Sequence, residues 1–391
     1  MNPINPNIKS LIFVSAYGEL SIIEVRSILK ENISKIEKIC DSTYEIQLSN
    51  PSPKELKQIS SCHKIGCIIY RNQDKIFSDK LVEELEYSKK KNFSISLYCS
   101  GDPERKYRML TEGLLDFCRH NHIRKLRLIR PSRGHEMRAE DIASREIFDL
   151  MFVERGPETI VGFVTHVHDF RDFHYRIAKR PQHDQTIEMS ARLARTLVNI
   201  ASLQRGETLL DPFCGSGTIL GEAILLGINC IGIDLNPRKV SESKRYLDWI
   251  ASQYSRTKVG SYKLIVGDAR SLKKILPDKK VDAIVTEPIL LPPYTRTPSY
   301  NEAQESLQRS RSIYSDAIKA MTWVLKDKGR LVIVTPEIRV KGGHTLTLEL
   351  DQEIKKSGLT PILSETGKEY FRLDSQNTRW VNRNVYIMKK I

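Results

Sequence analysis

The sequence predicts an α/β protein whose C-terminal part is organised around a doubly wound, mainly parallel sheet. Four short apolar runs, at 208–210, 230–234, 264–268 and 281–286, are typical of buried parallel strands. Segments with helical patterning separate these runs, and an acidic residue stands at or directly after the end of each one. In open α/β sheets, ligands bind at the carboxyl ends of the strands, so the four acidic ends predict a binding site.

The stretch GETLLDPFCGSGT, residues 206–218, is the most informative segment of the chain. An apolar run ends at Asp211-Pro212, and small residues then form a loop that leads into an apolar helix beginning at Thr218. A strand, a glycine loop and a helix N-terminus together direct free backbone N–H groups at a ligand. The loop lacks the third glycine of the dinucleotide fingerprint and the GK[ST] ending of a P-loop, so these alternatives fit poorly.

The series DPFCGSGT, GIDLNP, GDAR and TEP resembles the Rossmann-fold, S-adenosylmethionine-dependent amino-methyltransferases. Arg180-Pro181 and the segment MSARLARTLVNIA, residues 189–201, resemble the stretch before the catalytic core of THUMP-containing archaeal tRNA guanosine-N2 methyltransferases. The resemblance covers residues 170–290 well and the remainder more loosely. It implies a tRNA methyltransferase acting on the exocyclic N2 of a guanosine at position 10 of tRNA, with S-adenosylmethionine as cofactor and tRNA as partner.

The resemblance also implies roles for the acids at the strand ends. Asp234 lies where a doubly wound fold places the carboxylate that binds a ribose diol. Asp268 is expected to bind the adenine amino group, and the 211–218 loop the methionine part. The helix that begins near Met189 is expected to cover the methionine end. The residues predicted to bind the cofactor are Asp211, Phe213, Gly215, Ser216, Gly217, Thr218, Asp234, Leu235, Asp268 and Ala269.

The predicted catalytic segment departs from the family pattern, which is Asp/Asn-Pro-Pro-Tyr/Phe after the fourth strand. The acid and the next carbonyl accept hydrogen bonds from the target NH₂ and so orient its lone pair. Here Glu287-Pro288 is followed by Ile289-Leu290, and Pro292-Pro293-Tyr294 comes later in the loop. We predict that Glu287, with Pro288, binds the amino group and that Tyr294 stacks on the base. The alternative is that Glu287 is only a strand-end acid and that the prolines stiffen a loop.

The N-terminal half is expected to form two α+β domains. Residues 1–75 have a βαββαβ order, with predicted strands at 11–14, 36–40, 44–48 and 65–70, that resembles a ferredoxin-like domain. Residues 76–172 resemble a THUMP domain, and residues 166–181 are interpreted as the link to the methyltransferase domain at 173–391. In the last domain, a helix is expected at 346–355 and final strands at 330–334 and 385–388.

Charge favours a polyanionic partner, since the formal net charge is +14 at pH 7. Basic residues are concentrated at 119–138, where only Glu136 opposes them. A solvated surface is the usual explanation of such a run, but RNA contact is favoured in a basic chain that resembles a methyltransferase. The predicted RNA-binding residues are Arg119, Arg124, Lys125, Arg127, Arg130, Arg133 and Arg180.

Several classes of protein are disfavoured. The seven cysteines are odd in number and irregularly spaced, which favours reduced thiols over a disulfide framework. Cys62-His63 with Cys67 lacks a second ligand pair, so no metal is expected. No apolar run approaches the ~20 residues that span a bilayer, and no signal pattern is evident, so we expect a soluble cytoplasmic protein without membrane association.

Two other functions remain open. The altered tetrapeptide is compatible with a non-catalytic tRNA-binding module that kept the cofactor fold. A DNA adenine-N6 methyltransferase would share the core but would not account for the THUMP-like half. The sequence does not distinguish single from double methylation, nor does it predict an oligomeric state.

Overall fold

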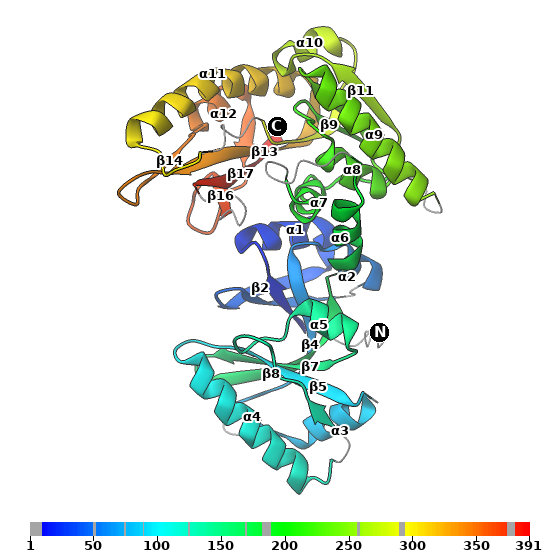
Figure 1. Ribbon diagram of the computed structural model, residues 1–391, viewed down its shortest axis with the longest axis vertical. Coiled ribbons are helices and arrows are strands. Elements are labelled where there is room, and N and C mark those ends of the chain that lie inside the picture. Colours follow the sequence, from blue (N-terminus) through cyan, green and yellow to red (C-terminus); the bar gives the residue numbers. More distant parts are fainter. Residues whose placement is uncertain are drawn as a thin grey trace. The chain divides into compact units, whose positions relative to one another are not determined.

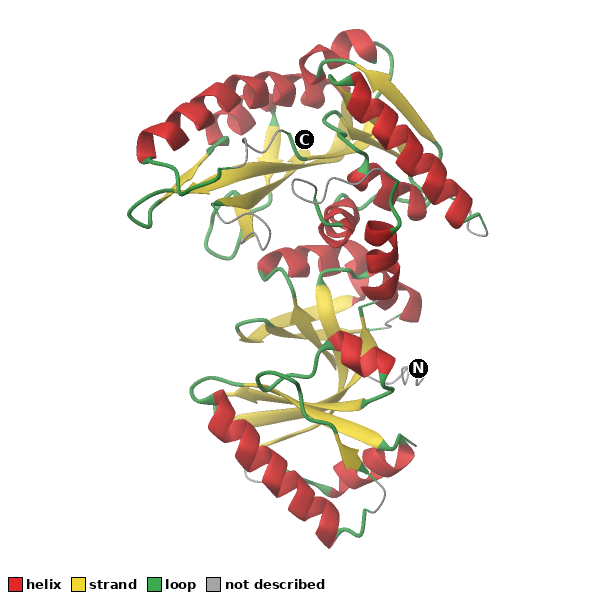
Figure 2. Ribbon diagram, viewed as in Figure 1, coloured by secondary structure: helices red, strands yellow, loops and turns green. Residues whose placement is uncertain are grey.

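The computed structural model describes residues 10–49, 52–73, 76–88, 90–123, 126–168, 170–181, 189–255, 259–288, 294–373 and 380–391. The chain divides into two compact units, Met1–Phe170 and Arg171–Ile391, which are described separately (Figure 1). Both units are mixed α/β structures with helices packed on sheets (Figure 2).

The first unit is built on one eight-stranded sheet with the order β2-β3-β1-β4-β8-β7-β5-β6. Strand β4 pairs antiparallel with β8, so the two predicted N-terminal domains share this sheet. The elements up to residue 75 are β1 (Ser10–Ser15), α1 (Glu19–Leu29), β2 (Ile33–Cys40), β3 (Thr43–Leu48), α2 (Pro53–Gln58) and β4 (Cys62–Asn72). The later elements are α3 (Asp79–Tyr87), β5 (Asn92–Tyr98), α4 (Pro103–His120), β6 (Arg127–Leu128), α5 (Ala139–Ser144), β7 (Phe148–Arg155) and β8 (Glu158–Val167).

Strand β1 has apolar side chains on both faces because both faces of the sheet are covered. Leu11 and Phe13 pack in a core with the apolar side of α1, whereas Ile12 and Val14 pack on the other face against Tyr98 of β5. An uninterrupted apolar strand is the expected sequence pattern for such a position. The strand expected at 11–14 is therefore confirmed, and it lies inside the sheet rather than at an edge.

A buried polar network joins three strands of the first unit. The Lys64 Nζ atom donates to the Ser96 Oγ atom at 2.9 Å and forms an ion pair with Asp149 at 3.3 Å. Ser94 donates to the other oxygen of Asp149 at 2.6 Å. Lys64 and Asp149 are 1% and 0% exposed, so the network neutralises charges that would otherwise be costly inside the core.

The second unit contains a nine-stranded sheet whose main path is β11-β10-β9-β12-β13-β17-β15. Neighbouring strands from β11 to β13 run parallel, and β17 runs antiparallel to β13. Its elements begin with α6 (Phe170–Ala178), α7 (Ala191–Ile200), β9 (Thr208–Asp211), α8 (Thr218–Leu225), β10 (Asn229–Asp234), α9 (Pro237–Gln253), β11 (Tyr262–Val266), α10 (Leu272–Ile275) and β12 (Val281–Thr286). They end with α11 (Tyr300–Val324), β13 (Leu325–Arg339), β14 (Thr345–Thr347), α12 (Asp351–Ser357), β15 (Leu359–Pro361), β16 (Tyr370–Leu373) and β17 (Val381–Lys390).

Two sequence expectations for this unit need correction. The helix expected at 346–355 is wrong in its first part, because residues 345–347 form β14 and the helix α12 starts only at Asp351. The run TLTLEL alternates between β-branched or polar residues and leucine, which is the period of a strand. The expected link at 166–181 instead contains the end of β8 and the helix α6.

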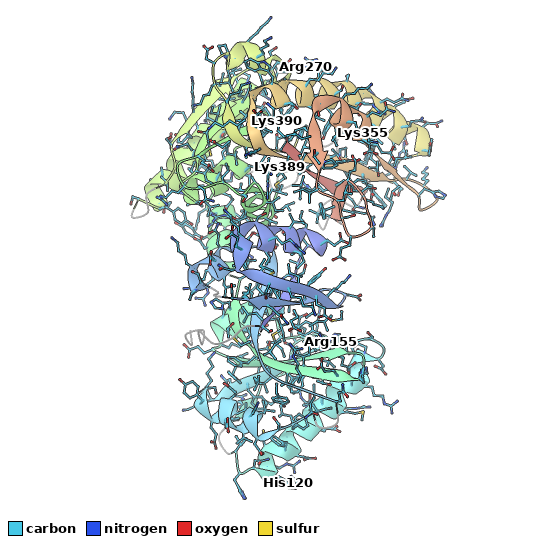
Figure 3. All side chains as sticks on the ribbon, turned by 180° about the vertical axis from the view of Figure 1, so that it is seen from behind. His120, Arg155, Arg270, Lys355, Lys389 and Lys390 are labelled. Atoms are coloured by element: carbon cyan, nitrogen blue, oxygen red, sulfur yellow. The ribbon has the colours of Figure 1, made fainter. Side chains whose placement is uncertain are left out.

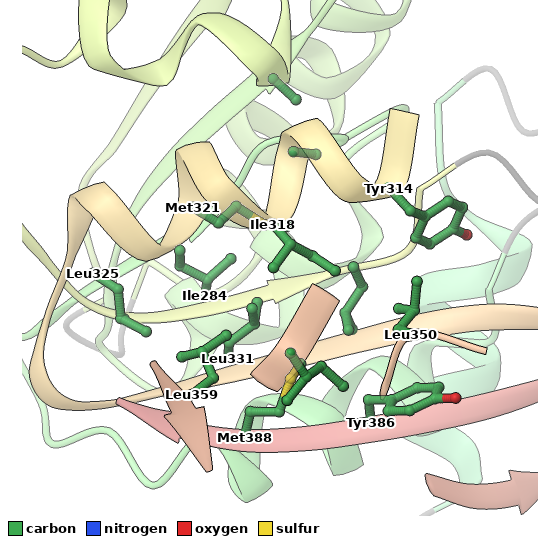
Figure 4. Packing of buried hydrophobic residues seen from close by; sticks show 14 of the residues in the cluster. Ile284, Tyr314, Ile318, Met321, Leu325, Leu331, Leu350, Leu359, Tyr386 and Met388 are labelled. Atoms are coloured by element: carbon green, nitrogen blue, oxygen red, sulfur yellow. The ribbon is translucent and has the colours of Figure 1, made fainter. Parts of the chain in front are cut away.

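Helix α11 packs on one face of this sheet and holds the central strands together. Its side chains Ile318 and Met321 belong to a core that also contains Ile284 of β12, Leu331 of β13 and Met388 of β17 (Figure 4). The helix starts with a capping box: Ser299 accepts from the Glu302 backbone, and the Glu302 side chain accepts from the Ser299 backbone. This packing fixes the ends of β12 and β17, which carry two side chains of the site described below.

Candidate active site

A cavity of about 490 Å³ lies at the carboxyl ends of β9, β10, β11 and β12. This is the edge at which the sequence predicted a ligand. The predicted cofactor residues that line it are Asp211, Phe213, Gly215, Ser216, Thr218, Asp234, Leu235, Asp268 and Ala269, and the predicted catalytic residues Glu287 and Pro288 line it too. Met189, just before α7, contributes to the wall.

The glycine loop between β9 and α8 is shaped by close packing and by its hydrogen bonds. Gly217 precedes α8 in a left-handed conformation with φ 89°, and a Cβ atom there would lie 2.4 Å from the Ser243 Oγ atom of α9. Any larger residue would therefore push α9 away from the loop. Gly217 is the one predicted cofactor residue that does not line the cavity, and its position is explained by this approach.

The Asp234 carboxylate ties the glycine loop to the start of α9. One of its oxygens accepts from the Gly215 backbone N–H at 2.9 Å, and the other accepts from the Asn236 backbone N–H at 2.9 Å. A carboxylate has about four acceptor positions, so each oxygen can still accept a hydrogen bond from a ligand. The geometry suits the predicted contact with a ribose diol.

The Asp211 carboxyl group is buried beneath the loop. Its Oδ1 atom accepts from the Thr286 hydroxyl at 2.6 Å and from the Phe213 backbone N–H at 3.1 Å. The pKa of Asp211 is raised from 3.8 to about 7, mainly by burial and also by the nearby carboxylates of Asp234 and Glu287, whereas the two hydrogen bonds lower it. Asp211 is therefore protonated more readily than an exposed aspartate.

Asp268 is held by a side chain that the sequence analysis did not single out. The Arg270 guanidinium donates to both oxygens of Asp268, with distances of 2.6 to 3.0 Å, and the Arg270 backbone N–H donates at 2.9 Å. These hydrogen bonds, with the positive charge of Arg270, lower the pKa of Asp268. Arg270 is exposed and also lines the cavity, so this wall carries a cation beside the acid (Figure 3).

Glu287, directly after β12, forms a two-point ion pair with Arg383 of β17. The Arg383 Nε atom donates to one carboxylate oxygen at 2.6 Å, and an Nη atom donates to the other at 3.4 Å. The two side chains are 13% and 11% exposed. Arg383 was missed because it lies 96 residues later, and no local pattern relates the two positions.

Comparison with known proteins agrees with this geometry. A family model described as RMKL-like, methyltransferase domain, matches residues 178–341, which include all four strand ends of the cavity. A second model, described as DNA methylase, matches residues 19–245, which is more than half of the chain. The chain belongs to this methylase family.

Several relatives carry a more specific name. The chain is 34% identical over 161 residues to the tRNA (guanine(10)-N2)-dimethyltransferase of Methanothermobacter thermautotrophicus, covering 41% of this chain and 40% of that protein. It is 32% identical over 237 residues to the tRNA (guanine(10)-N2)-dimethyltransferase of Methanocaldococcus jannaschii, covering 59% of this chain and 55% of that protein. The chain thus spans about half the length of the relatives it matches.

A solved structure has the same fold as the whole methylase chain. TrmN from Thermus thermophilus superposes with a TM-score of 0.53 over 98% of this chain and 99% of that chain, at 15% identity. At this identity the likeness establishes the shared fold and nothing more specific.

The stacking residue predicted for the methylase lies away from the cavity wall. Tyr294 packs partly buried against the core that α11 covers, and its buried hydroxyl has no hydrogen-bond partner among the described residues. It is not among the residues that line the cavity. Its stacking role remains a prediction, and the intervening Ile289, Leu290, Pro292 and Pro293 lie outside the described residues.

Arg180 occupies a different place from the one expected. It was grouped with the RNA-binding residues, but it is buried, and its two Nη atoms donate to the Thr218 hydroxyl at 2.7 Å and to the Ser216 carbonyl at 2.5 Å. Its guanidinium also stacks over the Tyr246 ring at 3.9 Å. The sequence cannot distinguish a buried arginine from an exposed one. Here Arg180 supports the cofactor loop.

The other predicted RNA-binding residues belong to the first unit. Arg127, Arg130 and Arg133 are exposed, and none has a carboxylate within ion-pair distance among the described residues. Arg119 is exposed and pairs with Asp116. Arg124 and Lys125 lie outside the described residues.

The glycine loop also contains a buried thiol, Cys214. Burial raises the pKa of the Cys214 thiol in the loop well above its ordinary range, which keeps it protonated. Within the part of the chain that the structure describes, no cluster of three or more His, Cys, Asp or Glu side chains could hold a metal ion. In that same part, no helix combines the length and apolar character needed to cross a bilayer.

Proposed function

We propose that this methylase transfers a methyl group from S-adenosylmethionine to the exocyclic N2 of a guanosine in tRNA, at position 10. The observation that carries this proposal is the Glu287 carboxylate at the rim of a cavity whose other walls suit the cofactor. The names of the relatives from two archaea support guanine in tRNA as the target.

The residues of the cavity fit S-adenosylmethionine. Asp234 keeps an acceptor position on each oxygen for a ribose diol, and Gly215 offers its backbone to the ligand without a Cβ atom. The volume of about 490 Å³ lies within the usual range of small-molecule sites, about 300–1,000 Å³. When bound, S-adenosylmethionine supplies a methyl group bonded to a positively charged sulfur and keeps the electron pair of the broken bond.

The chain contributes positioning and electrostatics. Glu287 accepts hydrogen bonds from the amino group of guanine, which turns the nitrogen lone pair away from the ring and towards the cavity. The lone pair forms the new N–C bond, and the nitrogen then releases one proton to water. The carboxylates of Asp234 and Glu287 provide a negative environment for a cationic ligand.

The first unit is proposed to bind the tRNA. Its first four strands have the order β2-β3-β1-β4 with antiparallel neighbours, which supports a ferredoxin-like half, and the following half is proposed to be a THUMP domain. Arg127, Arg130 and Arg133 provide an exposed cationic surface for phosphates. We also propose a cytoplasmic location, where tRNA is available as a substrate.

The decisive experiment identifies the methylated nucleoside. Purified protein is incubated with labelled S-adenosylmethionine and either tRNA or duplex DNA, and the nucleosides are separated by mass spectrometry. We expect N2-methylated guanosine from tRNA, and the ratio of its mono- and dimethylated forms shows how many methyl groups are added. N6-methyladenine from DNA would contradict the proposal.

Variants connect the product to the site. Glu287→Ala should abolish methyl transfer while calorimetry shows cofactor binding and gel shifts show tRNA binding. Glu305→Ala is the matched control, because Glu305 is 70% exposed on α11 and pairs only with Arg309 in the described structure. Protein that binds tRNA and cofactor but yields no product in any buffer would favour the non-catalytic alternative.

A further inference from the structure

Arg383 lies on β17, a strand that no cofactor-binding motif includes. Its strand pairs antiparallel with β13, with Arg383 opposite Pro336, and β13 in turn pairs with β12. The ladder therefore carries Arg383 to the end of β12, where its guanidinium meets Glu287 through the two hydrogen bonds described above. Both strands also contribute side chains to the core beneath α11.

We propose that Arg383 is a positioning residue for methyl transfer, which holds the Glu287 carboxylate oriented as a hydrogen-bond acceptor for the target amine. The inference rests on the proposed function, because it assumes that Glu287 receives the amino group.

The Arg383 guanidinium orients the Glu287 carboxylate. Glutamate has one more methylene than the aspartate expected at this position, so its carboxylate has an additional rotatable bond. A guanidinium that donates to both oxygens removes that freedom, since the planar fork matches the carboxylate plane. Each oxygen keeps an acceptor position, because a carboxylate has about four.

Arg383 also balances the negative charge around Glu287. The charged or titratable groups that face Glu287 in the described structure are Arg383, Asp211 and the Tyr314 hydroxyl of α11. Burial, and then Glu287, raise the pKa of Tyr314 well above its ordinary value, so this hydroxyl is neutral. Ionised Asp211 repels a second carboxylate. Among the described residues, Arg383 is the cation that offsets the negative charge of these carboxylates.

The ion pair with Arg383 gives Glu287 a specific part in the mechanism. Both oxygens of Glu287 are held by Arg383, so Glu287 serves to align the amine. The proton leaves to water after the N–C bond has formed. The loss of Arg383 should therefore lower the rate of methyl transfer more than it weakens the binding of the cofactor.

The test compares Arg383→Met, Arg383→Lys and Arg372→Met in the full chain. Arg372 is a matched control from the neighbouring strand β16, because it donates to Glu337 at 2.7 Å in a similar ion pair. With saturating tRNA and S-adenosylmethionine, we expect Arg383→Met to lower kcat about 10²-fold, with an unchanged Kd for the cofactor.

Arg383→Lys should restore only part of kcat, because it keeps the charge but lacks the planar fork. Arg372→Met should leave kcat and the cofactor Kd unchanged. An unchanged kcat in Arg383→Met, or a loss that Arg383→Lys does not relieve at all, would overturn the proposal. Thermal unfolding of each variant separates these results from misfolding, and Arg383→Lys keeps the test available if Arg383→Met does not fold.

The same experiments separate this inference from the function on which it rests. If Glu287→Ala remains active, the role proposed for Glu287 fails whatever Arg383 does. If Glu287→Ala is inactive and Arg383→Met retains the natural kcat, only the inference about Arg383 fails.

Discussion

Replacing Asp211 by Asn should make the protein more stable above neutral pH. Asp211 is fully buried, and no cation is within ion-pair distance of it among the described residues. Both of its hydrogen bonds, from the Thr286 hydroxyl and the Phe213 backbone, end on the same oxygen. Asparagine has the same shape and can keep that acceptor, so the substitution removes the charge and little else.

The size of the effect follows from the change in the pKa of Asp211, from 3.8 in the unfolded chain to about 7 in the folded protein. Between these values the folded state binds more protons than the unfolded state, so stability decreases as pH rises. One pKa unit corresponds to 1.36 kcal/mol, so the folded protein loses about 4 kcal/mol between pH 4 and pH 8 through this group. Asp211→Asn should therefore raise the free energy of unfolding by about 4 kcal/mol at pH 8 and by almost nothing at pH 4.

The assay is urea unfolding of both proteins at pH 5 and pH 8, with the slope m compared to ensure that the same surface unfolds. A gain that is independent of pH, or a loss of stability at pH 8, would refute the reasoning. The same variant should bind S-adenosylmethionine more weakly, because the ionised carboxylate attracts a cationic ligand. The natural residue would then be retained for binding at the expense of stability.

Three further predictions concern other parts of the chain. Lys64→Met should lower the free energy of unfolding by about 3–5 kcal/mol in urea melts, because it leaves the buried Asp149 without its ion-pair partner. The control is Lys244→Met, which removes an exposed ion pair, and an equally small effect of both substitutions would contradict this prediction. Arg180→Gln should raise the cofactor Kd about tenfold in calorimetry without changing tRNA affinity, since its guanidinium supports the loop, and the reverse result would return it to the RNA-binding set. A variant with alanine at Arg127, Arg130 and Arg133 should bind tRNA with a weaker dependence on salt. The slope of log Kd against log salt should fall by about 1 for each phosphate contact that is lost, and an unchanged slope would show that this surface does not bind tRNA.

Most of the second unit's framework was predictable because its strands have local signals. The expected strand at 281–286 coincides with β12, and the glycine loop, α8 and the acid that ends β10 are all where the motifs placed them. Such elements are apolar runs ended by turn residues, and a short window contains all of the information. The sequence analysis did not predict the hairpin of β7 and β8, although β8 lies beside β4 at the centre of the first sheet.

Residues of the candidate site were predictable only where they lie at or directly after the end of a parallel strand. Asp211, Asp234 and Glu287 were found because parallel strands bring their carboxyl ends to one edge. Arg383, the partner of Glu287, was not found. Its position is set by the antiparallel pairing between β13 and β17, and the register of such a pair is a tertiary property. Likewise, nothing near Arg180 in the sequence indicates that its charge is buried.

The pairing of β4 with β8 has a consequence for synthesis of the chain. Strand β4 is eleven residues long, and its partner residues on β8 are about a hundred positions later. At about 5–20 residues per second, a nascent chain carries β4 with one side unsatisfied for roughly 5–20 s. During this interval the open backbone can recruit a β-strand from another polypeptide. Growing chains should therefore depend on protection at the ribosome until Val167 has emerged.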